Sequence, residues 1–232
     1  MVPIQLPFAR GILRGGKSVG RARMPAAQCR ATTTRILGLD LGQARDHTAG
    51  VLLERNNYPS TFQGQRDDRF RGRLVKRWPL GTDYTALAVE VIETLPVDFL
   101  VIDFGGVGRA VVDLFRKEIQ ERGFSGRIIP VALIGSSAAG SLVRSLGRIH
   151  YNVPKVEVLT SIVLLWQQKR LTLPPGPETQ LLIEEMRNFR LHYTKAANLT
   201  MDAAPGQHDD LVIALGLGCW WGLRERKAAF LW

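Results

Sequence analysis

Residues 36–40 read ILGLD, a short apolar run that ends on a carboxylate. Residues 99–103 read FLVID and end in the same way, and a continuous apolar run of this kind is typical of a strand covered on both faces. We therefore predict two strands of one sheet. If these strands are neighbours, Asp40 and Asp103 meet at the same edge of that sheet.

Two further strands are predicted between these runs, HTAGVLLE (47–54) and GRLVKRW (72–78), separated by the polar stretch 56–71. Short consecutive strands with polar connections indicate an antiparallel meander. The next element is a helix that Thr82 or Asp83 can cap and that Pro96 ends.

Alternating strands and helices follow. The remaining predictions are a strand at 127–133 and helices at 107–121, 156–169, 178–190 and 208–226. Residues 134–152 are rich in Gly and Ser and are interpreted as a mobile loop, or alternatively as a segment that becomes ordered on DNA. The whole pattern predicts an α/β protein with a mixed central sheet, an antiparallel meander followed by parallel strands, flanked by helices.

A third acidic site, the pair Asp209-Asp210, opens the last predicted helix, where the helix dipole favours negative charge. Converging aspartates are the ligands that hard divalent cations take, and a pair of Mg²⁺ or Mn²⁺ ions suits phosphodiester hydrolysis. Each of these aspartates alone is more typical of a turn or a helix cap. Their order along the chain is the stronger signal.

Four segments together resemble the nuclease domain of phage terminase large subunits, which has the ribonuclease H-like (RuvC-like) fold: GLDLGQARDHTAGVLLE (38–54), DFLVIDFGGVGRAVVDLF (98–115), KRLTLP (169–174) and GQHDDLVIALGLG (206–218). The resemblance implies that two Mg²⁺ or Mn²⁺ ions are held by the catalytic carboxylates Asp40, Asp103, Asp209 and Asp210. It does not decide which member of the last pair bridges the ions. Asp46 is either an extra metal ligand or an exposed loop residue, and His208 either orients a carboxylate or phosphate or caps the helix.

The function implied by this resemblance is a metal-dependent endonuclease that cuts double-stranded DNA with little sequence preference during phage genome packaging. The expected partners are DNA and a separate terminase ATPase, small subunit or portal, in the cytoplasm of a bacterial or phage-infected cell and without a membrane. Two alternatives stay open: a Holliday-junction resolvase of the same fold, and a non-catalytic DNA-binding or assembly module. The run LGLDLG (37–42) resembles the first phosphate motif of actin-like sugar kinases and ATPases, but that architecture needs two such domains and the given sequence is too short for both.

The net charge of +10 is unevenly distributed. Residues 1–35 contain seven basic and no acidic residues, which predicts a flexible basic tail before a nuclease domain at 36–232. Other basic residues are interpreted as either a DNA-facing surface or a solvated one: Arg66, Arg69, Arg71, Arg73, Lys76, Arg77, Arg144 and Arg148.

Two apparent nucleotide motifs are rejected. Residues 11–18 fit the pattern of a phosphate-binding loop, but the prolines before them and the Gly and Pro residues after them exclude the required strand and helix. The GGVG turn at 105–108 lacks the other parts of a dinucleotide fingerprint, so we interpret its glycines as allowing close backbone approach beside Asp103. Cys29 and Cys219 have no zinc-site spacing, and no apolar run is long enough to span a bilayer.

Overall fold

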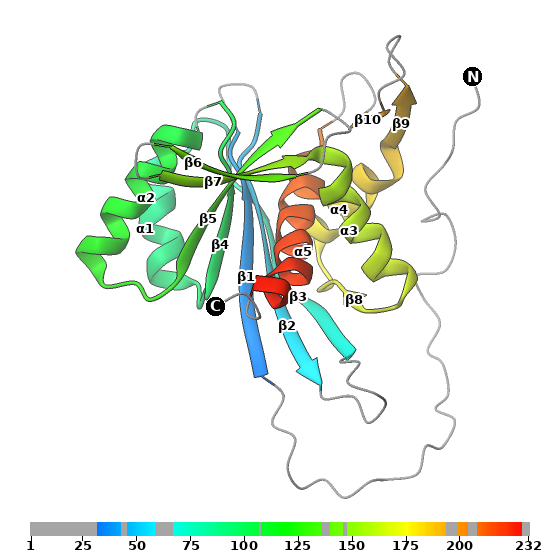
Figure 1. Cartoon of the computed structure of the whole chain (residues 1–232), viewed down its shortest axis with the longest axis horizontal. Coiled ribbons are helices and arrows are strands. Elements are labelled where there is room, and N and C mark those ends of the chain that lie inside the picture. The colour runs from blue at the N-terminus through cyan, green and yellow to red at the C-terminus, as the bar shows by residue number, and fades with distance from the viewer. Residues whose placement is uncertain are drawn as a thin grey trace, which may run out of the picture.

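A mixed sheet of eight strands is the central element of the computed structural model, which describes residues 32–42, 46–58, 67–106, 108–135, 140–145, 148–193, 199–203 and 208–228. The strand order is β6-β7-β5-β4-β1-β2-β3-β8 (Figure 1). The strands are β1 (Thr32–Asp40), β2 (Ala49–Tyr58), β3 (Asp67–Arg77), β4 (Phe99–Asp103), β5 (Arg127–Ile134), β6 (Ser141–Ser145), β7 (Arg148–Pro154) and β8 (Leu171–Thr172).

The topology confirms the predicted α/β class. Strands β1, β2 and β3 form the antiparallel meander, whereas β4, β5 and β7 run parallel to β1. Strand β1 begins at Thr32, four residues earlier than expected, and β2 and β3 extend into the polar stretch 56–71. The first 31 residues, including the 11–18 motif and Cys29, lie outside the described part of the chain.

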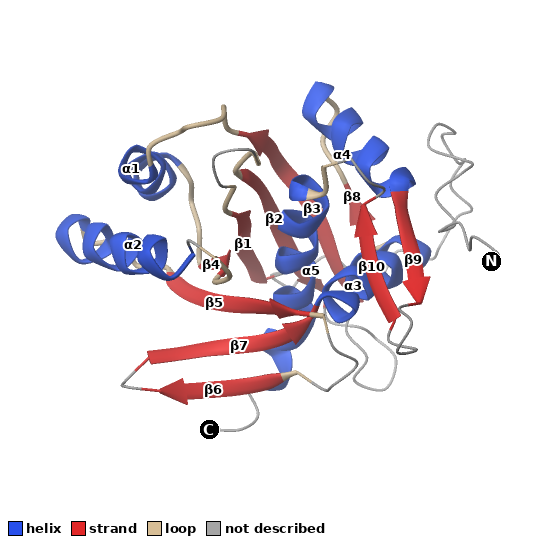
Figure 2. Cartoon of the chain, turned by 90° about the horizontal axis from the view of Figure 1, so that it is seen from above, coloured by secondary structure: helices blue, strands red, loops and turns tan. Residues whose placement is uncertain are grey.

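Helices cover both faces of the sheet, as Figure 2 shows. One face carries α1 (Tyr84–Thr94) and α2 (Gly108–Arg122), and the other carries α3 (Lys155–Gln167), α4 (Pro177–Asn188) and α5 (Asp210–Ala228). Asp83 caps α1 as predicted, because its side chain accepts the Ala86 N–H. A separate two-stranded sheet, β9 (Phe189–Tyr193) and β10 (Leu199–Ala203), lies between α4 and α5 in sequence.

The interpretation of residues 134–152 as a mobile loop was wrong for most of the segment. Strands β6 and β7 form an antiparallel hairpin at one edge of the sheet, and β7 also pairs with β5. Tyr151 explains the order physically, since its ring packs edge-on against Trp220 and Trp221 of α5. These apolar contacts come from a distant part of the chain and outweigh the local Gly and Ser composition.

Helix α5 is buried from Asp210 to Gly222, so it is a core helix and not a surface helix. It approaches β1 closely at Gly38, where an added Cβ would lie 2.0 Å from the Ala214 carbonyl oxygen. Only glycine permits this approach. Strand β1 and α5 therefore fit together at a distance that fixes the start of α5 over the sheet edge.

Replacing Gly38 by valine is expected to destabilise the protein by about 3 kcal/mol, since the added side chain would collide with helix backbone that cannot move aside. Urea unfolding measures the change. Gly135→Val is the matched control, because Gly135 is exposed and an added Cβ would have no neighbour within 4 Å. Equal stability of the two variants would contradict the proposed packing.

Candidate metal centre

Strand alternation places Asp40 and Asp103 on the same face of the sheet. Ile36 and Val101 pack into the core beneath α5, whereas Leu39 and Ile102 pack against α1 and α2. With a side-chain period of two, Asp40 and Asp103 belong with Ile36 and Val101 on the α5 face. Because β1 and β4 are parallel neighbours with Leu39 opposite Ile102, the two partly buried carboxylates lie side by side, as the sequence predicted.

The start of α5 brings the second acidic pair to this edge. Asp210 is its first residue and is only 6% exposed, while Asp209 precedes it and is partly exposed. The close contact at Gly38 directs the amino end of α5 towards the carboxyl end of β1. All four aspartates that were predicted to be catalytic therefore lie at the same edge of the sheet.

The pKa of Asp40 responds to the other three carboxylates. Burial raises the pKa of Asp40 well above its ordinary value, and the negative charges of Asp103, Asp210 and Asp209 raise it further. Lys155 opposes this effect. Carboxylates gathered in this way repel one another when ionised, and a bound cation would relieve that repulsion.

Asp103 is held by backbone groups. The Gly105 N–H donates to Asp103 Oδ1 at 2.8 Å, and burial raises the pKa of this carboxyl group while hydrogen bonds from the Gly105 and Leu133 backbones lower it. An added Cβ at Gly108 would lie 2.2 Å from the Asp103 carbonyl oxygen. The glycines of the 105–108 turn therefore allow the close backbone approach that the sequence suggested.

A polar cleft of about 210 Å³ opens over the carboxylates. Its lining includes Asp40, Asp46, His208, Asp209 and Asp210. Asp46 is exposed, and its charge helps to raise the pKa of Asp210, for which burial is the largest cause. His208 lies with Nδ1 3.8 Å from Asp210 Oδ2, so it faces this carboxylate and not solvent alone.

Two charged residues of the site were not identified from the sequence. Lys155, the first residue of α3, donates from Nζ to Asp209 Oδ2 at 2.7 Å. Glu185 of α4 is buried and accepts the N–H groups of Leu211 and Val212 at the start of α5. Neither residue sits in a local motif, and only the packing of α3 and α4 against α5 reveals them.

The predicted DNA-facing residues are dispersed. Arg77 is partly buried, donates to Glu185 and lies 3.9 Å from Asp210, so it belongs to the carboxylate site. Lys76, Arg73 and Arg148 are engaged in ion pairs with Glu90, Glu54 and Asp113 respectively. Arg69, Arg71 and Arg144 have exposed side chains, and Arg66 lies outside the described residues.

The donor set fits a hard divalent cation, because it consists of carboxylate oxygens and Asp210 Oδ2 is buried without a hydrogen-bond partner. Within the described ranges, no three Asp, Glu, His or Cys side chains are close enough to enclose an ion as they stand.

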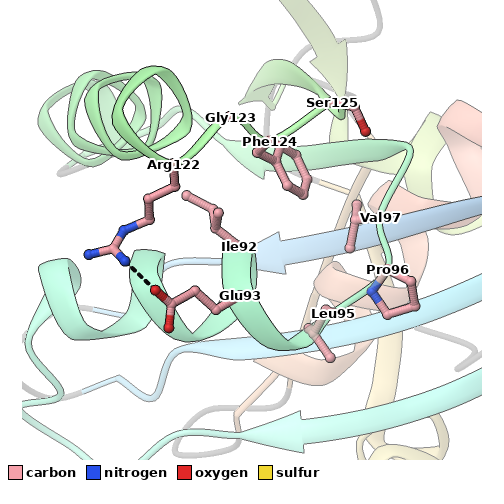
Figure 3. Close-up of a pocket in the computed structure, with 9 residues that line it drawn as sticks. All are labelled: Ile92, Glu93, Leu95, Pro96, Val97, Arg122, Gly123, Phe124 and Ser125. Carbon is pink, nitrogen blue, oxygen red and sulfur yellow. Dashed lines mark hydrogen bonds and ion pairs between the residues drawn. The ribbon is translucent and has the colours of Figure 1, made fainter.

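A second hollow lies at the opposite end of the strands, where α1 and α2 end and β4 and β5 begin. Figure 3 shows the Arg122 guanidinium directed at Glu93 among the residues that line it. Apart from that ion pair its lining is mainly apolar and backbone, so it offers no set of acids. None of the described helices combines the length and apolar character needed to cross a membrane.

Neither a family model nor a curated protein matches the sequence. Among solved structures, the large terminase nuclease from thermophilic phage G20c with bound magnesium has 21% identity and a TM-score of 0.53, with 82% of each chain covered. A mutant nuclease domain of the large terminase subunit gp2 of bacterial virus Sf6, with manganese and β-thujaplicinol, has 12% identity and a TM-score of 0.55, covering 82% of this chain and 89% of that one.

The full HK97 bacteriophage large terminase also matches, with 15% identity and a TM-score of 0.50, over 82% of this chain and 39% of that one. At these identities the comparisons establish the fold. It is the ribonuclease H-like fold of phage large terminase nuclease domains, as the sequence predicted.

Proposed function

We propose that this protein is a divalent-metal-dependent endonuclease that cuts double-stranded DNA with low sequence specificity, as the nuclease module of a phage-type terminase. The observation that carries the proposal is the convergence of Asp40, Asp103, Asp209 and Asp210 at one edge of a ribonuclease H-like sheet. A binding module has no need to concentrate negative charge where a DNA phosphate would approach.

The proposed cofactors are two Mg²⁺ or Mn²⁺ ions, supported by the oxygen donors of the site and by the magnesium and manganese in similar nuclease structures. Asp40, Asp103 and Asp210 would hold them, with Asp209 as a further ligand and Asp46 at the rim. When bound, such ions activate a water molecule and neutralise charge on the attacking and leaving oxygens of the phosphodiester.

Other residues of the protein position and partly neutralise the carboxylates at this edge of the sheet. Strands β1 and β4 fix Asp40 and Asp103 side by side, and backbone N–H groups hold the Asp103 carboxylate. Lys155 neutralises part of the acidic charge through its ion pair with Asp209, which places a cation beside the proposed metal site. Lys155 therefore serves as an electrostatic residue of the proposed site.

The proposed partners are double-stranded DNA and, in a packaging assembly, a terminase ATPase, small subunit or portal. The support is the fold shared with large terminases, including the HK97 protein in which a comparable region is part of a longer chain. Exposed arginines such as Arg71 and Arg144 are suited to phosphate contacts, which carry no sequence information.

Cleavage of supercoiled plasmid tests the proposal. We expect nicked and then linear DNA in Mg²⁺ or Mn²⁺, no cleavage in excess EDTA, and similar rates on linear duplex and four-way junctions. A preference for junctions above about tenfold would instead indicate a resolvase, since such a ratio corresponds to about 1.4 kcal/mol of discrimination. DNA binding without cleavage in either metal would favour the non-catalytic module.

A further inference from the structure

A buried ion pair from two other elements holds the start of α5. Glu185 of α4 accepts the Leu211 N–H at 3.0 Å and the Val212 N–H at 3.2 Å through Oε2. Its other oxygen, Oε1, accepts from Nη2 of Arg77, the last residue of β3. One carboxylate therefore caps α5 and fixes a guanidinium group at the same time.

The same Arg77 nitrogen lies beside Asp210. Nη2 is 3.9 Å from Asp210 Oδ2, which is too long for a hydrogen bond. Asp210 Oδ2 and Arg77 Nε are both buried and both lack a hydrogen-bond partner in the described part of the chain. Opposite charges this close attract strongly away from water, so a free Arg77 would close onto Asp210.

We propose that Glu185 and Arg77 are positioning residues, in which Glu185 holds Arg77 away from Asp210 and so keeps Asp210 Oδ2 available to a divalent metal ion. The inference rests on the metal site of the proposed function. The His208 ring, whose Nδ1 lies 3.8 Å from Asp210 Oδ2, is about half exposed, so water competes with it for this oxygen. Arg77 is partly buried and has no comparable access to water.

Glutamine at position 185 distinguishes the two interactions of the Glu185 carboxylate, one with the start of α5 and one with Arg77. The amide oxygen of Glu185→Gln can still accept the N–H groups of α5, but its NH₂ group cannot accept from Arg77. Arg77 is then free to pair with Asp210 and compete with the metal. The double variant Arg77→Met/Glu185→Gln has no guanidinium group at position 77. Nothing then competes with the metal for Asp210, so the loss of the Glu185 carboxylate no longer matters for metal binding.

The experiment is a Mn²⁺ titration of the whole protein without DNA, by calorimetry or electron paramagnetic resonance. Burial raises the pKa of Glu185 to about 7, so the titration is run at about pH 8, where the carboxylate is largely ionised. Glu185→Gln is expected to bind Mn²⁺ about ten- to a hundredfold more weakly than the wild type. The double variant should recover to within about threefold, a recovery that a loss of folding alone would not produce.

Glu54→Gln is the matched control, since Glu54 pairs with Arg35 and Arg73 outside the carboxylate site and its loss should leave Mn²⁺ binding unchanged. The inference would be overturned if Glu185→Gln bound Mn²⁺ as tightly as the wild type, or if the double variant bound Mn²⁺ as weakly as Glu185→Gln. Neither result would contradict the metal site itself. If Glu185→Gln alone does not fold, a double variant that binds more than about tenfold more weakly than wild type overturns it equally. Absence of Mn²⁺ binding by the wild type would overturn the metal site and, with it, the inference.

Discussion

Replacing Asp40 by asparagine is expected to lower the rate of plasmid cleavage about a thousandfold, because the loss of metal-assisted charge neutralisation costs several kcal/mol in the transition state. Asp40 is the centre of the site, since the charges of Asp103, Asp210 and Asp209 all act on its carboxyl group. The amide keeps the shape of the side chain but is a much poorer ligand. Rates of nicking in Mn²⁺ measure the effect.

The same substitution should not unfold the protein. Because the pKa of Asp40 is raised in the folded state, the stability linked to its protonated form is lost as the pH rises through that pKa. At about pH 8 without metal, the Asp40→Asn variant is therefore expected to melt at the same temperature as the wild type or higher. A lower melting temperature together with lost cleavage would point to a structural role instead.

The two aspartates of the Asp209-Asp210 pair are expected to contribute unequally to metal binding. Asp210 is buried and its Oδ2 has no hydrogen-bond partner among the described residues, so it is expected to be the stronger metal ligand of the two. Mn²⁺ at about a hundred times its dissociation constant should stabilise the wild type by about 2.7 kcal/mol. Asp210→Asn should abolish this gain and lower cleavage about a thousandfold.

Asp209→Asn provides the comparison, because Asp209 is partly exposed and engaged by Lys155. This variant should retain most of the Mn²⁺ stabilisation and lose only about ten- to a hundredfold in cleavage rate. Thermal unfolding with and without Mn²⁺ distinguishes the two variants. A larger loss in Asp209→Asn than in Asp210→Asn would reverse the assignment within the pair.

Local sequence patterns predicted much of the sheet and its helices. The FLVID strand is placed at Phe99–Asp103 as expected, and Asp83 caps α1. Such features depend on neighbouring residues, whose alternation and capping groups are visible in the sequence. The β6–β7 hairpin was not predicted, because Tyr151 is ordered by tryptophans about seventy residues later in the chain.

For the carboxylate site, the sequence by itself indicated which aspartates to consider, since a strand that ends on Asp and a helix that begins with Asp are both local patterns. Only the tertiary structure decided what surrounds them. The sequence leaves Arg77 as either a DNA-facing or a solvated residue, whereas in the structure it pairs with Glu185, 108 residues away in the chain, beside Asp210. Hydrogen bonds and ion pairs between distant segments depend on how α4 and α5 pack on the sheet, and that packing leaves no periodic pattern in the sequence to read.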